Sequence, residues 1–238
     1  MDMVSILFFS FIAGIVTGLG ALISIIFKKP SEKIMSWSLG FAAGIMIGIS
    51  TLSLIPESFA AGWTWTCVLG VVLGAFCLWL VDELLPHQHK TDQPEKDFTK
   101  VGTFIAIGIA FHNLPEGIAI GASSEVSAKL GLYTAISIGI HNIAEGLSVA
   151  MPLRMGKMRR RRIVIVTTLT GMTTLIGAII GLQLVSISPA FISISLAFAA
   201  GAMLYIASDE LIPISHRVHS HFANMGMLMG ILLALLIK

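Results

Sequence analysis

Two copies of one short polar motif contain the residues of this sequence that are best suited to chemistry. Residues 112–117 read His-Asn-Leu-Pro-Glu-Gly, and residues 141–146 read His-Asn-Ile-Ala-Glu-Gly, 29 positions later. Each copy lies in the middle of an apolar segment that is long enough to cross a bilayer. In both copies the His and the Glu are four positions apart, so on a helix they share one face.

Ionisable side chains in the middle of a membrane need a compensating partner. One charged side chain at the bilayer centre costs about 2.5–3.5 kcal/mol on insertion scales, and this sequence places two Glu there, each with a His and an Asn. A divalent metal ion is the simplest partner for carboxylates and neutral imidazoles together. The alternative, a His–Glu hydrogen-bond network between helices without metal, stays open. The candidate metal ligands are His112, Asn113, Glu116, His141, Asn142 and Glu145.

The composition is that of a membrane protein with very little soluble mass. Of the 238 residues, 55% are hydrophobic and only 12% are charged, whereas a soluble domain has about 25% charged residues. The mean hydropathy is +0.91. The two cysteines, Cys67 and Cys77, fall in one apolar segment without CxxC spacing, so we interpret them as ordinary buried thiols. We expect no prosthetic group, and the lipid bilayer is the expected surrounding.

The apolar runs predict an all-α polytopic protein with eight transmembrane helices and no separate soluble domain. The longest polar stretch, 87–100, is a short loop, so residues 1–238 form a single transmembrane domain. The N-terminus has no basic segment before the first apolar run, which we therefore expect to be retained as a span. The expected helices are about 3–27, 34–56, 64–86, 101–122, 130–152, 163–185, 190–212 and 221–237.

The distribution of Lys and Arg predicts the orientation. Thirteen of the fifteen lie in the loops after the first, third, fifth and seventh spans. Because cytoplasmic loops carry the excess of Lys and Arg, these loops are expected to be cytoplasmic and both termini extracytoplasmic. We interpret the run Arg159–Arg162 as a topology determinant in this sense. A nucleic-acid or anionic-lipid site is the alternative interpretation of that run, although we expect no nucleic-acid partner.

An internal repeat predicts how the spans are arranged. Residues 36–58 align without gaps with residues 193–215, and thirteen of the 23 positions are identical. These are the second and seventh spans, which cross the membrane in opposite directions, as do the fourth and fifth spans with the paired motifs. One two-fold axis in the membrane plane would relate both pairs and give a 3+2+3 arrangement. Inverted repeats around a polar site at mid-membrane are typical of secondary transporters.

Together, the paired motifs and the two Phe-Ala-Ala-Gly…Leu-Ile-Pro segments resemble the ZIP (Zrt/Irt-like) metal transporters, most closely the compact prokaryotic branch. The resemblance covers essentially the whole chain. It implies eight helices in a 3+2+3 arrangement and uptake of zinc, and often iron, manganese, cobalt or cadmium, into the cytoplasm. It places the metal centre on the six candidate ligands of the fourth and fifth spans. It also implies sliding of spans 1, 4, 5 and 6 against spans 2, 3, 7 and 8, and in many members a homodimer.

Two positions depart from the family pattern. In the sixth span, Thr174 stands where prokaryotic relatives usually have a Glu, and the loss of that carboxylate lowers the negative charge around any second ion. Whether one or two ions occupy the centre therefore stays open. In the second span, Ser53 stands where a His is common in parts of the family. Ser53, Asp209 and Glu210 are secondary candidates that would line the metal pathway toward the ends of the helices.

We therefore interpret the chain as a plasma-membrane transporter of divalent transition-metal cations, with zinc first, and not as an enzyme. The sequence shows no nucleotide-binding motif, so an ion gradient or the metal gradient itself would drive transport. The rival hypothesis is an intramembrane hydrolase in which a fixed metal ion activates water. The missing His-Glu-x-x-His motif and the inverted repeat argue against it. A metal-independent channel or sensor is a third alternative.

Overall fold

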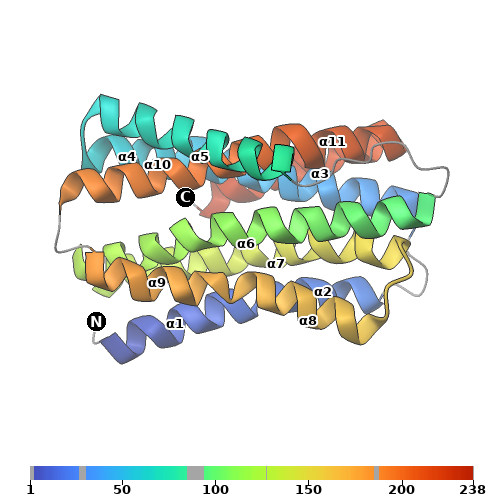
Figure 1. The fold of residues 1–238 in the computed structure, drawn as a ribbon, viewed down its shortest axis with the longest axis horizontal. Coiled ribbons are helices and arrows are strands. Elements are labelled where there is room, and N and C mark those ends of the chain that lie inside the picture. The colour runs from blue at the N-terminus through green and yellow to red at the C-terminus, as the bar shows by residue number, and fades with distance from the viewer. Residues whose placement is uncertain (1–2, 27–30, 85–93, 127, 185–187, 238) are drawn as a thin grey trace.

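A computed structural model describes residues 3–26, 31–84, 94–126, 128–184 and 188–237, and every element in these ranges is helical. Figure 1 shows the helices running side by side along the length of the molecule. The elements are α1 (Met3–Ile15), α2 (Thr17–Ile26), α3 (Glu32–Ile49), η1 (Ser50–Leu54), α4 (Ile55–Ala61), α5 (Thr64–Leu84), α6 (Pro94–Val126), α7 (Ala128–Met155), α8 (Arg160–Gly171), α9 (Thr173–Leu184), α10 (Pro189–Ile206), η2 (Ala207–Leu211) and α11 (Ile212–Ile237).

Length and composition mark five stretches of the described chain as able to cross a membrane, namely Met3–Ile26, Glu32–Ala61, Phe98–Gly121, Arg160–Gln183 and Ala190–Leu236. A shorter apolar helix covers Thr64–Leu80. The last stretch contains the two final expected spans, and the backbone leaves helical geometry between them at His219, with φ −162° and ψ 93°. The chain is thus an all-helical polytopic membrane protein, and the count of eight crossings stays a prediction.

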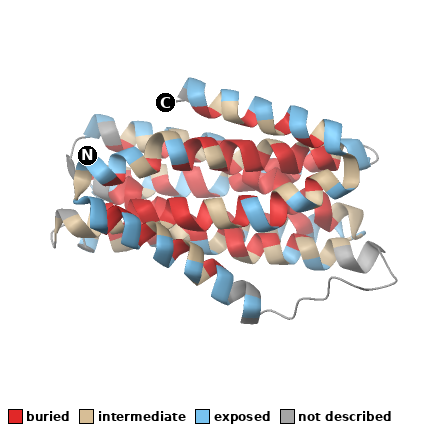
Figure 2. Ribbon diagram, turned by 90° about the horizontal axis from the view of Figure 1, so that it is seen from above, coloured by how far each residue is buried: buried red, intermediate tan, exposed pale blue. Residues whose placement is uncertain are grey.

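The helices form two groups that face each other across the molecule (Figure 1). In one group α3 packs on α11 and α10 packs on α5. In the other group α6 packs on α7 and α9, while α2 packs on α7 and α8. The groups meet where α3 contacts α7 and α10 contacts α6. Figure 2 shows the buried residues on the inner faces of the helices and the exposed ones outside, where lipid would contact them.

The two copies of the internal repeat carry the same irregularity at the same place. The π-helical turns η1 and η2 occupy Ser50–Leu54 and Ala207–Leu211, which are matching positions of the alignment. The contacts match as well: Ser36 donates a hydrogen bond to the carbonyl of Ser215, at 2.7 Å. The corresponding pair is Ser193 and Ser58, and there Ser58 donates to the carbonyl of Ser193 at 2.8 Å. A two-fold relation between the copies predicts that both pairs meet, although it would make Ser193 the donor, so the match holds for the paired residues and not for the direction of the hydrogen bond.

The first and sixth spans extend this relation beyond what we predicted. Each is interrupted near its middle, at Val16 between α1 and α2 and at Met172 between α8 and α9. The backbones cross closely at Gly14 and Gly171, where a Cβ on either glycine would meet the backbone of the other. The main repeat pairs residues that are 157 positions apart. With the same offset, residues 14–26 and 171–183 are identical at only five of 13 positions, too few to indicate a repeat from the sequence alone.

The start of α6 differs from the expected boundary. The stretch 87–100 reads as a polar loop, whereas α6 already begins at Pro94. Proline fits the first turn of a helix, because the N–H that it lacks would have no helical partner there. Residues 87–93 of the expected loop lie outside the described residues.

Candidate metal centre

The two motifs meet in the contact between α6 and α7, which pack against each other along their lengths. All six candidate ligands are buried, with at most 1% of each side chain exposed. They are His112, Asn113 and Glu116 on α6, and His141, Asn142 and Glu145 on α7. The structure therefore brings the sequence-predicted residues together in one place inside the protein.

Each histidine pairs with the glutamate of the other helix. His112 Nε2 lies 2.7 Å from Glu145 Oε1, and His141 Nε2 lies 2.8 Å from Glu116 Oε1. Within one helix the corresponding distances are longer, 4.0 Å from His112 to Glu116 and 3.7 Å from His141 to Glu145. The crossed pairs are equivalent under the two-fold relation that links the motifs. They tie α6 to α7 at the depth of the site.

The three groups His112, Glu116 and Glu145 each offer a ligand atom, and these atoms lie within 4.8 Å of one another. Two atoms that bind one zinc ion at about 2.0–2.2 Å lie at most about 4.4 Å apart, so small side-chain rotations would bring these groups to bonding distance of one ion. Of the described residues, these form the group of histidine and carboxylate side chains that is spaced to hold a metal ion.

The two asparagines anchor the centre to the interrupted spans. Asn142 Nδ2 donates to the carbonyl of Ala13 at 2.9 Å, and Asn113 Nδ2 faces the carbonyl of Thr170 at 3.4 Å. Ala13 and Thr170 again occupy matching positions of the repeat. The amide oxygen of Asn142 is buried and accepts no hydrogen bond within the described part of the chain.

The head group of Asn113 fits the centre in two orientations. With its oxygen turned inward, that atom faces the second oxygens of Glu116 and Glu145, each at 3.1 Å, and such a cluster of acceptors suits a cation. With the amide rotated, the nitrogen occupies the same position and donates to both carboxylates. The second orientation gives the amide nitrogen acceptors for its N–H groups, whereas the first leaves the amide oxygen facing only acceptors.

Thr174 lies beside the motif of α6. Its backbone carbonyl packs against Gly117, the residue after Glu116, and its buried hydroxyl has no hydrogen-bond partner among the described residues. Thr17 occupies the matching position beside Gly146 of α7, and its buried hydroxyl likewise has no hydrogen-bond partner among the described residues. Sequence reasoning singled out Thr174 but missed Thr17, whose signal is the weak repeat in the first span.

The secondary pathway candidates lie in the two π-helical turns and not in the His–Glu group. Ser53, in η1, is half-buried, whereas in η2 the side chain of Asp209 is exposed and that of Glu210 is buried. η2 contacts α3 and α10, the helices that face the motif helices. The structure thus places all three on the group opposite the candidate ligands.

Comparison with known proteins identifies the family. The family described as ZIP Zinc transporter matches residues 87–238. The chain is 36% identical to the zinc transporter ZupT of Chlorobium limicola, over 92% of this chain and 91% of that protein. It is 34% identical to ZupT of Corynebacterium aurimucosum, over 97% and 96%, and 33% identical to ZupT of Escherichia fergusonii, over 89% and 87%. The chain belongs to the ZIP family.

Membership of the ZIP family decides between the classes that the sequence left open. ZIP proteins are membrane transporters, so this chain is a transporter and not an enzyme, and the hydrolase hypothesis is set aside. The buried His–Glu group between α6 and α7 is a place in this ZIP protein where a divalent metal ion would fit.

Proposed function

We propose that this ZIP protein carries divalent transition-metal ions, zinc first, across the plasma membrane into the cytoplasm. The observation that carries the proposal is the crossed pair of His–Glu contacts buried between α6 and α7. His112, Asn113, Glu116, His141, Asn142 and Glu145 would bind the transported ion as substrate. A mixed nitrogen and oxygen set of this kind also accepts iron, manganese, cobalt and cadmium.

The crossed contacts explain why binding would be reversible. A metal ion needs neutral imidazole and ionised carboxylate, so it has to replace the two short His–Glu contacts at 2.7 and 2.8 Å. The empty centre is not left with unpaired buried carboxylates, which would make ion release costly. The ion therefore competes with internal hydrogen bonds and is released more easily than from a closed site.

The packing supports movement of one helix group against the other. Gly117 and Gly177 hold α6 against α9, and Gly20 and Gly146 hold α7 against α2, each with backbone in close contact. The first, fourth, fifth and sixth spans would thus move as one unit past α3 and α10.

In this proposal residues 1–238 form one domain with eight crossings in a 3+2+3 arrangement. The basic loops face the cytoplasm and both termini lie outside, and a homodimer is the expected assembly.

Uptake into proteoliposomes tests the proposal. Purified protein should give saturable influx of Zn²⁺, with weaker influx of Cd²⁺, Fe²⁺ and Mn²⁺, because imidazole nitrogen favours zinc over manganese. The measurement is the initial rate for each ion against empty liposomes. Tight binding of zinc without flux, or a higher rate for Mn²⁺ than for Zn²⁺, would contradict the proposed activity or its selectivity.

The presence of Thr174 in the sixth span predicts how many metal ions the centre binds. We expect the natural chain to bind one Zn²⁺ and the Thr174→Glu variant to bind two, because a third carboxylate beside Glu116 adds the charge that a second ion needs. Equilibrium dialysis with metal analysis gives the stoichiometry. Thr167→Glu is the matched control: Thr167 is buried in the same span and its hydroxyl also lacks a partner among the described residues. It lies seven positions, or roughly 10 Å, away. Two ions in the natural chain, or one in Thr174→Glu, would refute this expectation.

A further inference from the structure

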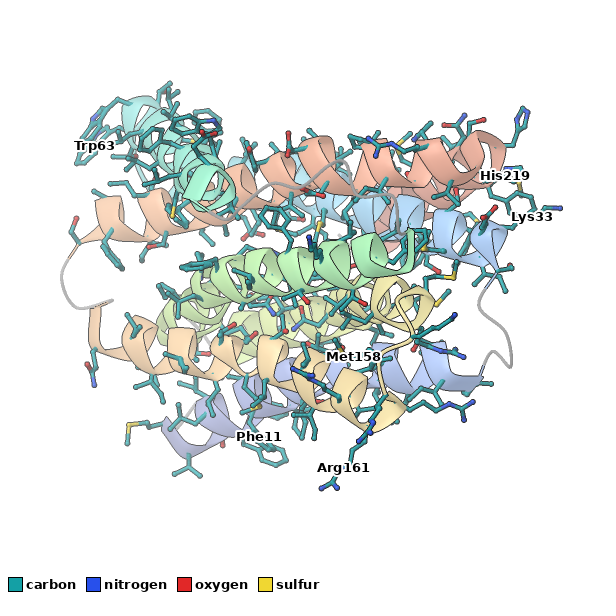
Figure 3. All side chains as sticks on the ribbon, turned by 45° about the vertical axis from the view of Figure 1, so that its right-hand side comes forward. Phe11, Lys33, Trp63, Met158, Arg161 and His219 are labelled. Carbon is teal, nitrogen blue, oxygen red and sulfur yellow. The ribbon has the colours of Figure 1, made fainter. Side chains whose placement is uncertain are left out.

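A pocket of about 500 Å³ opens at the connection between α7 and α8. Arg159, Arg161 and Arg162 line it, together with Thr99, Gly156, Met158 and Ile165. Figure 3 shows the side chain of Arg161 extending outward at the lower edge of the molecule, while Trp63 lies at the upper left. None of the described residues that line the pocket is acidic.

The connection that forms the pocket is firmly held. The N–H groups of Gly156, Lys157 and Met158 donate to the carbonyls at the end of α7, at 2.8 to 3.0 Å. Lys157 takes a left-handed conformation, with φ 59°, to complete this turn. The hydroxyl of Thr99 on α6 donates to the carbonyl of Gly156 at 3.0 Å. A run of arginines that served only as a topology signal would not need to line a built pocket.

The positive charge of the pocket is not balanced by the described part of the protein. No hydrogen bond or ion pair joins Arg159, Arg161 or Arg162 to another side chain of the described residues. Arg159, Arg161 and Arg162 lie at the N-terminal end of α8, where the helix dipole favours negative charge and cations are unfavourable. Arg159 precedes α8 without a side-chain capping bond to its free N–H groups. Both features favour an anion.

The positive charge of Arg154, at the end of α7, also favours an anion in this region. Arg154 lies beyond the expected end of the fifth span at 152. Its partial burial, together with the positive charge of Arg160, lowers the pKa of Arg154. Positive charges at this end of the molecule thus act on one another, and a bound anion would relieve the repulsion.

The position along α8 indicates the source of the anion. Ile165 is 47% exposed and Leu169 is 62% exposed, one helical turn apart, so this face of α8 would contact lipid chains. The arginines precede this stripe by about one turn, which places them at the level of the headgroups. Basic pockets beside transmembrane helices on the cytoplasmic side suit phospholipid head groups. A free phosphate would gain nothing from the apolar stripe.

We propose that this pocket binds the phosphate group of an anionic phospholipid of the cytoplasmic leaflet, with an acyl chain along Ile165 and Leu169. Arg161 and Arg162 would hold the phosphate beside the free N–H groups of α8. The site lies apart from the candidate metal centre, and it would fix α8, and with it the moving group of helices, to the membrane surface.

Spin-labelled lipids test the proposal on the whole purified protein in phosphatidylcholine vesicles. The natural chain should prefer labelled phosphatidylglycerol over labelled phosphatidylcholine. The Arg161→Gln/Arg162→Gln variant should lower this preference on the order of tenfold, since each basic residue near the membrane surface contributes to lipid attraction. Lys33→Gln/Arg217→Gln is the matched control, which removes two exposed cations of the same expected side and should leave the preference unchanged. Arg161→Gln alone should give a partial loss and replaces the double variant if that variant does not fold.

Three results would overturn the proposal: no preference in the natural chain, equal losses in the variant and the control, or full displacement of the lipid by millimolar inorganic phosphate. The last result would assign the pocket to free phosphate. Failure of metal uptake would leave the lipid measurement intact, so the two proposals are tested independently.

Discussion

We expect the Glu116→Gln variant to lose uptake of Zn²⁺, with the initial rate in proteoliposomes falling about 100-fold or more. Substitution of groups that only support a metal ligand already costs about 10- to 100-fold, and Glu116 would contact the ion itself. Glu116 also pairs with His141 at 2.8 Å, so its loss leaves that histidine without its charged partner. Because the two motifs are equivalent in the structure, Glu145→Gln should be as severe.

The control for this experiment is Glu32→Gln. Glu32 is an exposed carboxylate in the first turn of α3, far along the chain from both motifs, and its variant should transport at the natural rate. Size-exclusion chromatography of all variants separates loss of function from loss of fold. Uptake at more than a tenth of the natural rate by folded Glu116→Gln would show that the ion does not depend on this carboxylate.

The second large effect is expected on stability, at Gly146 of α7, which has no side chain to bind a metal ion. A Cβ on Gly146 of α7 would collide with the backbone carbonyl of Thr17 in α2, which cannot move aside as a flexible side chain would. Overpacking of a tight interior typically costs about 1–3 kcal/mol, and here the neighbour is rigid, so we expect Gly146→Ala to lose about 3 kcal/mol of stability. The measurement is the midpoint of thermal unfolding in detergent.

Gly139→Ala is the matched control for that experiment, because it makes the same change in the same helix. The nearest atom to a Cβ on Gly139 belongs to Ala13, at 3.6 Å, which is ordinary contact distance. Alanine is also the better helix former, by about 0.8–1.0 kcal/mol, so this variant should be at least as stable as the natural chain. Equal unfolding midpoints for the two variants would show that α2 and α7 are not packed this closely.

The sequence was sufficient to predict which polar side chains lie together between α6 and α7, because spacing determines which residues share a face of one helix. It was not sufficient to predict how they pair. The four-residue spacing suggests a contact between His112 and Glu116, whereas the short contact of His112 is with Glu145 of the other helix. Pairing across helices depends on how their backbones cross, and no local pattern in either motif encodes that crossing.

The irregular parts of the helices were likewise beyond prediction. The turn at Ser50–Leu54 and its partner at Ala207–Leu211 differ at four of their five positions, so composition does not mark them as π-helical. The interruptions at Val16 and Met172 contain neither Pro nor Gly. Both interruptions lie beside the close approach of Gly14 and Gly171, which are 157 positions apart, so no local pattern reveals their relation.

The crossed His–Glu pairs also affect the return step of a transport cycle, when the carrier holds no metal ion. After delivering its ion, a carrier has to return empty, and two bare carboxylates would oppose that passage through an apolar interior. Here each acid meets a base of the other helix at 2.7 or 2.8 Å, so each pair can hold a proton without net charge. In the proposed cycle the unloaded carrier resets with protons bound in place of the metal ion, so protons serve as the counter-substrate and exchange of one metal ion for another is unnecessary.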